Sequence, residues 1–218
     1  MLIHVAQKNI NNLDLESFVE SAYKEKADLV CFGELSTSGC LYQPKKVDPL
    51  EAITNKIKHP LGVLFGTPLE IDGNLYNTYV YYKNKAYQIY KKINLFSPMD
   101  EDKIYQAGNK PGLFKTEYGK FGIAICYDIR FPEIFTNLKN LSPDIIFIPA
   151  AFPRVRINDW KELLIQRAIE TETTIVGINS IGDDGTNEFG GSSMVVDKAG
   201  EILAQADEST ETVLKVSL

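Results

Sequence analysis

The chain has 218 residues and a formal net charge of −6 at pH 7, with 44% hydrophobic and 24% charged residues. This composition is typical of a folded globular protein, and the length predicts one domain over residues 1–218. The acidic balance argues against nucleic acid as a partner, because phosphate binding needs clustered Lys and Arg. No stretch has the length of a membrane span or the pattern of a secretory signal, so we expect no membrane partner and a cytoplasmic location.

The hydrophobic periodicity alternates between that of strands and that of helices. Strands are expected over residues 2–7, 28–33, 61–67, 75–82, 86–90, 111–115, 120–125, 144–148, 174–178, 192–196, 201–206 and 211–216. Helices are expected over residues 11–26, 49–58, 131–140 and 158–172, and residues 99–108 are expected to cross as a loop. Many strands with few long helices indicate an α/β fold in which two mixed sheets stack between helices, a four-layer α-β-β-α sandwich.

Cysteine and histidine usage narrows the chemistry. The three cysteines, Cys31, Cys40 and Cys126, have no CxxC spacing, so neither a disulfide framework nor a zinc knuckle is predicted. The two histidines, His4 and His59, lie outside any motif and are too few for a zinc hydrolase site. Phosphate-binding glycine patterns are missing as well. We therefore expect no metal and no cofactor, and any general base should be a carboxylate.

Cys126 follows an apolar run at residues 121–125, and the Phe-Pro-Glu at 131–133 can open a helix. A side chain at such a strand-to-helix junction lies at the rim of a sheet, near unpaired backbone N–H groups, where a nucleophile is useful. The alternative is that Cys126 is one more small apolar residue, as most unpaired cysteines are.

Two other predicted strands also end in ionisable residues. Glu34 follows the buried run at 28–33, and α/β folds place ligand chemistry at strand ends, although a solvated loop acid is the alternative. Lys91 and Lys92 close the hairpin and point to opposite faces, so that one of them can reach the interior. The alternative for this pair is a charged edge that discourages aggregation.

Together, Glu34, Lys92 and Cys126 resemble the Glu-Lys-Cys constellation of the nitrilase superfamily of carbon–nitrogen hydrolases, and the resemblance covers nearly the whole chain. The matching segments are Phe-Gly-Glu at 32–34, Tyr-Lys-Lys-Ile-Asn-Leu-Phe at 90–96, Ile-Cys-Tyr-Asp-Ile-Arg-Phe-Pro-Glu at 125–133, Arg-Ala-Ile-Glu at 167–170 and Gly-Gly-Ser-Ser-Met-Val-Val-Asp at 190–197. One departure is Asn94, which stands where histidine is common. The resemblance implies the four-layer nitrilase-like fold.

The resemblance also selects among neighbouring candidates. It implies that the lysine directly before Ile-Asn-Leu-Phe, Lys92, is catalytic, and that a second glutamate follows it. Glu101 best matches that glutamate, with Asp100 and Asp102 as alternative registers. The flanks of both glutamates look most like the omega-amidases, which act on 2-oxo-acid amides such as 2-oxoglutaramate.

The chemistry that the resemblance implies suits these residue types. A free cysteine has a pKa of about 8.5, so Glu34 would take the proton from Cys126 as the general base. Lys92 and the backbone N–H of Tyr127 would stabilise the oxyanion, and one such donor can contribute roughly 3 kcal/mol. Ammonia would leave, water would hydrolyse the thioester, and Glu101 would orient Lys92.

Further residues are candidates for binding the small-molecule amide. Arg130 can bind a substrate carboxylate or pair with a nearby Glu. Ala151 and Phe152 can form the pocket wall or pack in the core. Two other functions stay open, namely an N-carbamoyl amine or amino-acid hydrolase and a catalytically silent binding or regulatory subunit with the same fold. The resemblance further implies a homodimer or higher homo-oligomer.

Overall fold

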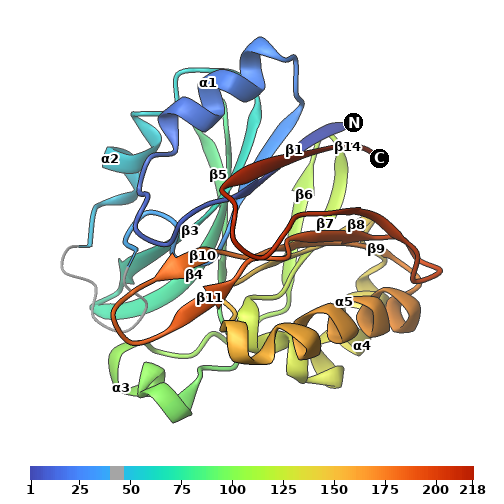
Figure 1. The fold of residues 1–218 in the computed structure, drawn as a ribbon. Helices are drawn as coiled ribbons and strands as arrows, with labels where there is room; N and C mark the ends of the chain where they lie inside the picture. The colour runs from blue at the N-terminus through green and yellow to red at the C-terminus, as the bar shows by residue number, and fades with distance from the viewer. Residues whose placement is uncertain (40–46) are drawn as a thin grey trace.

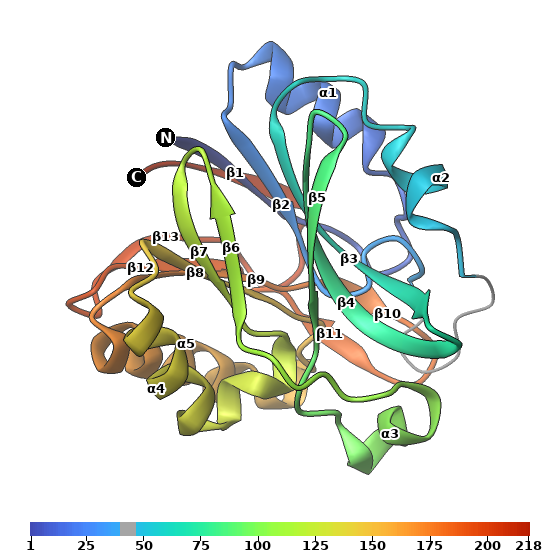
Figure 2. The same ribbon diagram turned by 180° about the vertical axis from the view of Figure 1, so that it is seen from behind.

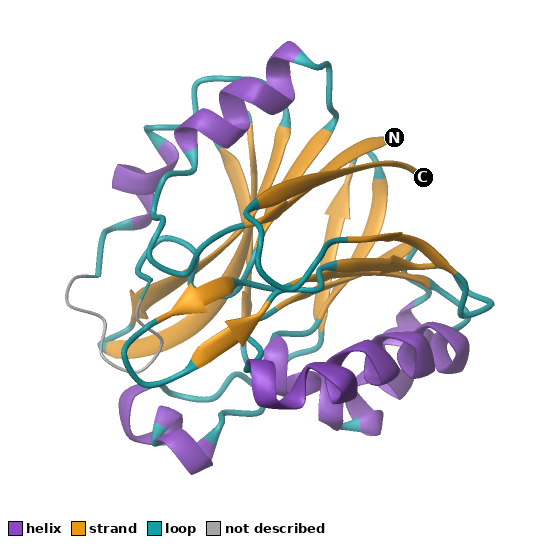
Figure 3. Ribbon diagram, viewed as in Figure 1, coloured by secondary structure: helices purple, strands orange, loops and turns teal. Residues whose placement is uncertain are grey.

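The structure is a computed structural model that describes residues 1–39 and 47–218. Two six-stranded mixed sheets pack face to face, and helices cover the outer side of each sheet (Figures 1 and 3). The predicted four-layer α-β-β-α arrangement is confirmed. Cys40 lies outside the described residues, so its expected role as a free thiol is left untested.

The first sheet has the strand order β14-β1-β2-β3-β4-β5. Its strands are β14 (Thr212–Ser217), β1 (Leu2–Gln7), β2 (Leu29–Phe32), β3 (Gly62–Ile71), β4 (Asn74–Lys83) and β5 (Ala86–Lys91). β1, β2 and β3 run parallel, and the other neighbours pair antiparallel. Helices α1 (Glu16–Lys24) and α2 (Leu50–Thr54) cover its outer face (Figure 1). Pairing of β1 with β14 brings the two chain ends together.

The second sheet has the order β13-β12-β9-β8-β7-β6, with β7, β8 and β9 parallel. Its strands are β13 (Ile202–Gln205), β12 (Met194–Val196), β9 (Thr174–Ile178), β8 (Ile145–Pro149), β7 (Gly119–Ile123) and β6 (Gly112–Thr116). Helices α4 (Pro132–Leu141) and α5 (Ile157–Thr171) cover its outer face. The edge strands β5 and β6 of the two sheets lie side by side (Figure 2).

The apolar runs of the central strands explain the layers. Every residue of β2 and β8 is buried, as expected for parallel strands covered on both faces. One apolar cluster, with Tyr79, Phe121 and Phe147 among its members, fills the space between the sheets. Two further clusters lie between each sheet and its helices. The stack is therefore rigid, and the strand ends hold the loops in fixed positions.

The structure differs from the expected local structure in several places. Helix α1 begins at Glu16 rather than at residue 11, because the Asn12 side chain accepts from the Asp14 N–H in a turn, and the Asp14 side chain accepts from the Ser17 N–H and so satisfies a donor of the first helical turn. Residues 99–108 are not all loop, since a 3₁₀ turn (Ser97–Met99) and helix α3 (Glu101–Ile104) lie there. The hairpin of β10 (Ile181–Asp183) and β11 (Glu188–Gly190) was not predicted. In the part of the chain that the structure describes, no helix is long and apolar enough to cross a membrane.

Candidate active site

The ends of four strands and one short helix bring the predicted residues to a single cleft. Glu34 follows β2, Lys92 follows β5, Cys126 follows β7 and Ala151 follows β8, whereas Glu101 begins α3. All five line the cleft. We call Glu34, Lys92, Glu101 and Cys126 the floor of the cleft, because the first three are only 2–3% exposed and the thiol is partly exposed beside them.

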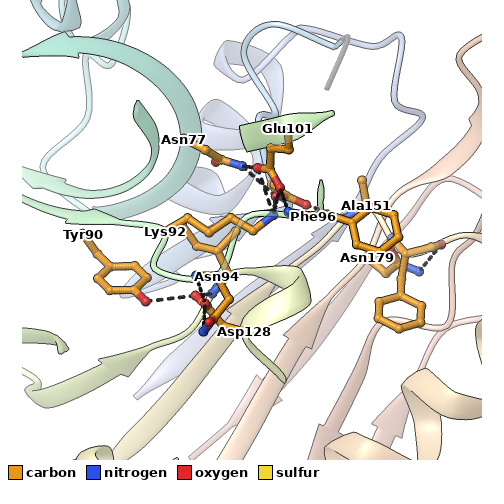
Figure 4. Close-up of polar contacts among 12 residues, drawn as sticks. Asn77, Tyr90, Lys92, Asn94, Phe96, Glu101, Asp128, Ala151 and Asn179 are labelled. Atoms are coloured by element: carbon orange, nitrogen blue, oxygen red, sulfur yellow. Dashed lines mark hydrogen bonds and ion pairs between the residues drawn. The ribbon is translucent and has the colours of Figure 1, made fainter. Parts of the chain in front are cut away.

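Lys92 pairs with both glutamates of this floor, and Figure 4 shows its side chain directed toward Glu101. Its Nζ donates to Glu34 Oε1 at 2.8 Å and to the two oxygens of Glu101 at 3.0 and 2.8 Å. The side chain of Asn77 donates to Oε1 of Glu34 and to Oε1 of Glu101, both at 2.8 Å. The second oxygen of Glu34 accepts from the Ala151 N–H at 3.2 Å. Glu34 is thus held by three donors, and its carboxylate lies close enough to Cys126 to interact with the thiol.

Glu101, rather than either neighbouring aspartate, reaches Lys92. Its carboxylate also accepts from the Phe96 N–H at 2.7 Å, which closes the loop after β5 onto α3. Asp100 instead is 64% exposed and pairs with Lys103 at 2.9 Å. Of the acids at 100–102, Glu101 is therefore the one that contacts Lys92 in the described structure.

Left-handed backbone marks three of these positions. Cys126 itself has φ +46°, Leu35 directly after Glu34 has φ +46°, and Asp100 directly before Glu101 has φ +61°. Such conformations cost a non-glycine residue about 1–3 kcal/mol each, and they cluster at functional sites. Gly66 lies against this backbone, since a Cβ there would come within 2.3 Å of the Leu35 nitrogen. The loops are bent sharply to aim the side chains into the cleft.

Asp128 fixes the turn that carries the nucleophile. Its Oδ2 accepts from the Ile125 N–H and the Tyr90 hydroxyl, both at 2.9 Å, and its Oδ1 accepts from the N–H and side-chain amide of Asn94 at 2.8 and 3.0 Å. Burial raises the pKa of Asp128, although these hydrogen bonds act in the opposite direction. Asn94, the departure from the family pattern, is thus a direct partner of the turn that carries Cys126.

The electrostatics of the floor define its resting state. Burial raises the pKa of Cys126 well above its ordinary value, and the nearby Glu34 charge raises it further, while Lys92 and the Ala151 N–H act in the opposite direction. Burial would lower the pKa of Lys92, but attraction to Glu34 and Glu101 raises it well above the usual range. Both shifts favour the protonated forms of the thiol and the amine, so the mechanism needs a base to remove the thiol proton.

The remaining predicted residues line the upper part of the cleft. Arg130 pairs with Asp159 at 2.7 Å, so the expected glutamate partner was wrong and the ion pair itself was right. Phe152 lines the cleft and also packs on Trp160, with ring centroids 5.4 Å apart. Ala151 and Tyr127 line it as well. The alternatives of pocket wall and core packing thus both apply to Phe152.

Sequence reasoning missed Asn77 and Asp128. Both are polar residues that are at most 1% exposed, and they hold the charged groups from behind. A signal for Asp128 was its place two residues after Cys126, inside the nucleophile motif; Asn77 had no local signal. The histidines lie elsewhere, each near a glutamate on the α1 side. Within residues 1–39 and 47–218, no group of three or more His, Cys, Asp or Glu could hold a metal ion.

Comparison with known proteins agrees with this geometry. The carbon-nitrogen hydrolase family model matches residues 5–218. The chain therefore belongs to the carbon–nitrogen hydrolase family and is a hydrolase of carbon–nitrogen bonds, in the nitrilase superfamily.

Among its relatives is the 2-oxoglutaramate amidase of Bacillus subtilis (strain 168), 34% identical over 204 residues, which cover 87% of this chain and 77% of the relative. The 2-oxoglutaramate amidase of Paenarthrobacter nicotinovorans is 39% identical over 134 residues, 59% of this chain and 45% of that one. The fold matches a CN-hydrolase superfamily protein from Xanthomonas campestris with a TM-score of 0.84, 23% identity and coverage of 99% and 89%. It also matches an amidase from Nesterenkonia with a TM-score of 0.88, 21% identity and coverage of 100% and 91%.

Proposed function

We propose that this carbon–nitrogen hydrolase is an omega-amidase that cleaves the terminal amide of a small 2-oxo acid and releases ammonia. The observation that carries the proposal is the meeting of two carboxylates, one ammonium and one partly exposed thiol on the floor of a single cleft. The names of the Bacillus and Paenarthrobacter relatives support the substrate class. Glu34, Lys92, Glu101 and Cys126 are the residues to which we assign catalysis.

In the first half-reaction, Cys126 Sγ attacks the amide carbonyl while Glu34 Oε2 takes the thiol proton. Lys92 contacts one oxygen of Glu34 and both oxygens of Glu101, and in this scheme one of its three N–H groups turns to the oxyanion, together with the backbone N–H of Tyr127. The tetrahedral intermediate collapses as Glu34 returns the proton to the leaving nitrogen. The carbon–nitrogen bond breaks, ammonia departs and a thioester to Cys126 remains.

In the second half-reaction, Glu34 takes a proton from water, and the resulting hydroxide attacks the thioester at the same oxyanion position. The carbon–sulfur bond breaks, the sulfur regains the proton and the carboxylic acid leaves. Glu101 does not exchange a proton in this scheme. It balances the Lys92 charge and fixes its direction, because both of its oxygens lie within 3.0 Å of the ammonium.

The test is to incubate the protein with 2-oxoglutaramate and, separately, with an N-carbamoyl amino acid. Intact-mass spectrometry follows acyl adducts on Cys126, and ammonia and carbon dioxide are both measured. Ammonia without carbon dioxide, together with a thioester adduct that Cys126→Ala lacks, supports the proposal. Carbon dioxide from the carbamoyl substrate alone would favour the carbamoyl hydrolase. Absence of both products and adducts would favour the silent subunit.

Two expectations about cellular context accompany this function. The cytoplasmic location stays a prediction from the sequence, and so does assembly into a homodimer or higher homo-oligomer. Sedimentation equilibrium at micromolar protein tests the assembly, since a purely monomeric protein would contradict it.

A further inference from the structure

The cleft contains a second arginine, Arg156, that forms no ion pair among the described residues, and the nearby acid Asp159 is already paired with Arg130. On the floor, Glu34 and Glu101 surround Lys92, and above them Arg130 is paired with Asp159 at 2.7 Å. Arg156 also lines the cleft and is exposed, yet it forms no ion pair with any residue that the structure describes. An unpaired guanidinium in a cleft with largely apolar walls attracts an anion.

A second donor without an acceptor lies in the same cleft. The side-chain nitrogen of Asn187 is buried and has no hydrogen-bond partner among the described residues. The backbone of Asn187 is fixed, because its N–H donates to Asp184 Oδ1 at 2.8 Å and its carbonyl accepts from the Asp184 N–H at 3.2 Å. A buried amide N–H left without an acceptor is unfavourable, so a ligand oxygen there would be stabilising.

Arg156 and Asn187 come from two segments that run alongside each other. Pro153 forms an antiparallel bridge with Phe189, so the residues after Pro153 lie beside those before Phe189. An ion pair between Arg154 Nε and Glu188 at 2.7 Å holds the same two segments together. We call Arg130, Arg156 and Asn187 the mouth of the cleft.

We propose that Arg156 and Asn187 form the subsite for the acid end of the substrate, with the carboxylate on the guanidinium and the 2-oxo oxygen on the Asn187 amide. This assignment rests on the proposed function and deepens it. It assigns the carboxylate to Arg156 in place of Arg130, whose charge Asp159 already balances. It also explains the choice of a 2-oxo acid over a 2-amino acid, because an ammonium would face the Asn187 N–H donor with no acceptor between them.

The first test compares 2-oxoglutaramate with butyramide, which lacks the acid end. Arg156→Gln should raise KM for 2-oxoglutaramate about 10- to 100-fold and leave kcat and the turnover of butyramide unchanged, because one charge-assisted hydrogen bond is lost. Arg156→Lys should recover part of the affinity. The matched control is Lys198→Gln, which removes one exposed positive charge outside the cleft and should leave KM unchanged.

The second test compares 2-oxoglutaramate with glutamine, which differs only at the second carbon. Asn187→Asp replaces the donor by an acceptor, so the ratio of kcat/KM values should shift toward glutamine by about 10-fold or more. Both substrates carry the carboxylate, and the ratio is therefore insensitive to the weakened attraction at Arg156. An unchanged ratio would overturn the role of Asn187.

Direct binding separates a failure of this inference from a failure of the proposed function. Titration calorimetry with 2-oxoglutarate on the wild type and on Arg156→Gln needs no turnover. Weaker binding to the variant supports the subsite even if no amide is cleaved. Equal binding, or a larger loss in Arg130→Gln than in Arg156→Gln, overturns it. If the wild type releases no ammonia from 2-oxoglutaramate, the proposed function is wrong, but the subsite assignment is not contradicted by that result.

Discussion

The floor and the mouth of the cleft are built in opposite ways. On the floor, every charge is buried and contacts several partners, as Lys92 does with Glu34 and Glu101. At the mouth, Arg130 has one ion partner, the half-exposed Asp159, and Arg156 forms no ion pair among the described residues. The charged groups of the floor are therefore satisfied by one another, whereas at the mouth Arg156 and the Asn187 amide can still bind a ligand.

This difference teaches how one fold separates reaction from substrate choice. Removing one member of a buried charged network leaves an uncompensated charge and costs about 3–5 kcal/mol. Changing an exposed ion pair costs about 0–1 kcal/mol. Substitutions on the floor should therefore destroy turnover, and substitutions at the mouth should mainly change which molecule binds.

The largest effect should come from Glu34→Gln, and it should separate two activities of Cys126. Loss of the base should lower amide turnover by about 10⁴-fold. The same change removes a negative charge that raises the pKa of Cys126, so the thiolate fraction at pH 8 should rise. Alkylation by iodoacetamide, followed by mass spectrometry, should thus become faster while ammonia release falls. Parallel losses of both rates would contradict the assigned base.

The second largest effect should come from Lys92→Met, which should lower kcat by about 10³-fold. It should also lower the free energy of unfolding by about 3–5 kcal/mol, because two buried carboxylates lose their counter-ion. Because the pKa of Lys92 is raised, this stabilisation should be fully present below about pH 10 and fade only at higher pH. Urea unfolding at pH 8 and steady-state kinetics measure the two effects.

Lys91→Met is the matched control for that substitution. The Lys91 ammonium lies 3.6 Å from the centre of the Tyr76 ring. Among the described residues it forms no ion pair with Glu34 or Glu101. Its loss should cost about 1 kcal/mol or less and leave kcat unchanged. Equal effects at the two neighbouring lysines would remove the distinction between floor and surface.

Asn77→Asp should have a smaller and pH-dependent effect. The amide of Asn77 donates to both glutamates, and an aspartate would put a third carboxylate between them. Like charges raise the pKa of acids, so the acidic limb of kcat/KM should move up by about one pH unit, with up to about 10-fold lower activity at pH values below the limb. Asn74→Asp, on the exposed end of the same strand, should leave the limb in place. A uniform loss at all pH values would indicate only a damaged fold.

The sequence predicted the parts of this molecule that have local causes. Strand β9 was predicted residue for residue, because a short apolar run between turn residues allows little else. The hairpin of β10 and β11 was missed, since each strand has only three residues and neither shows a clear alternation. The start of α1 was missed because the Asn12 side chain holds the preceding residues in a turn and the Asp14 side chain binds an N–H of the first helical turn.

The residues of the candidate site also divide into those that local sequence could indicate and those that it could not. Glu34, Lys92 and Cys126 were accessible to sequence reasoning because each ends a strand and carries chemistry. Asn77 acts from inside a strand, 43 residues from Glu34, and nothing in its neighbourhood indicates that partner. The acid that pairs with Arg130 lies 29 residues away on α5, so only the assembled layers identify it as Asp159.

The smallest expected effect comes from a substitution at the mouth of the cleft, and it tests whether the mouth changes substrate binding without changing kcat. Asp159→Asn removes the exposed carboxylate that balances Arg130 and lies near Arg156. More positive charge would then be available to a substrate carboxylate, so KM for 2-oxoglutaramate should fall about two- to threefold with kcat unchanged. Added salt should reduce the gain, because screening weakens exposed charges. Glu162→Gln, exposed on the same helix but outside the cleft, is the control. A fall in kcat of the size seen on the floor would mean that the mouth is also part of the chemistry.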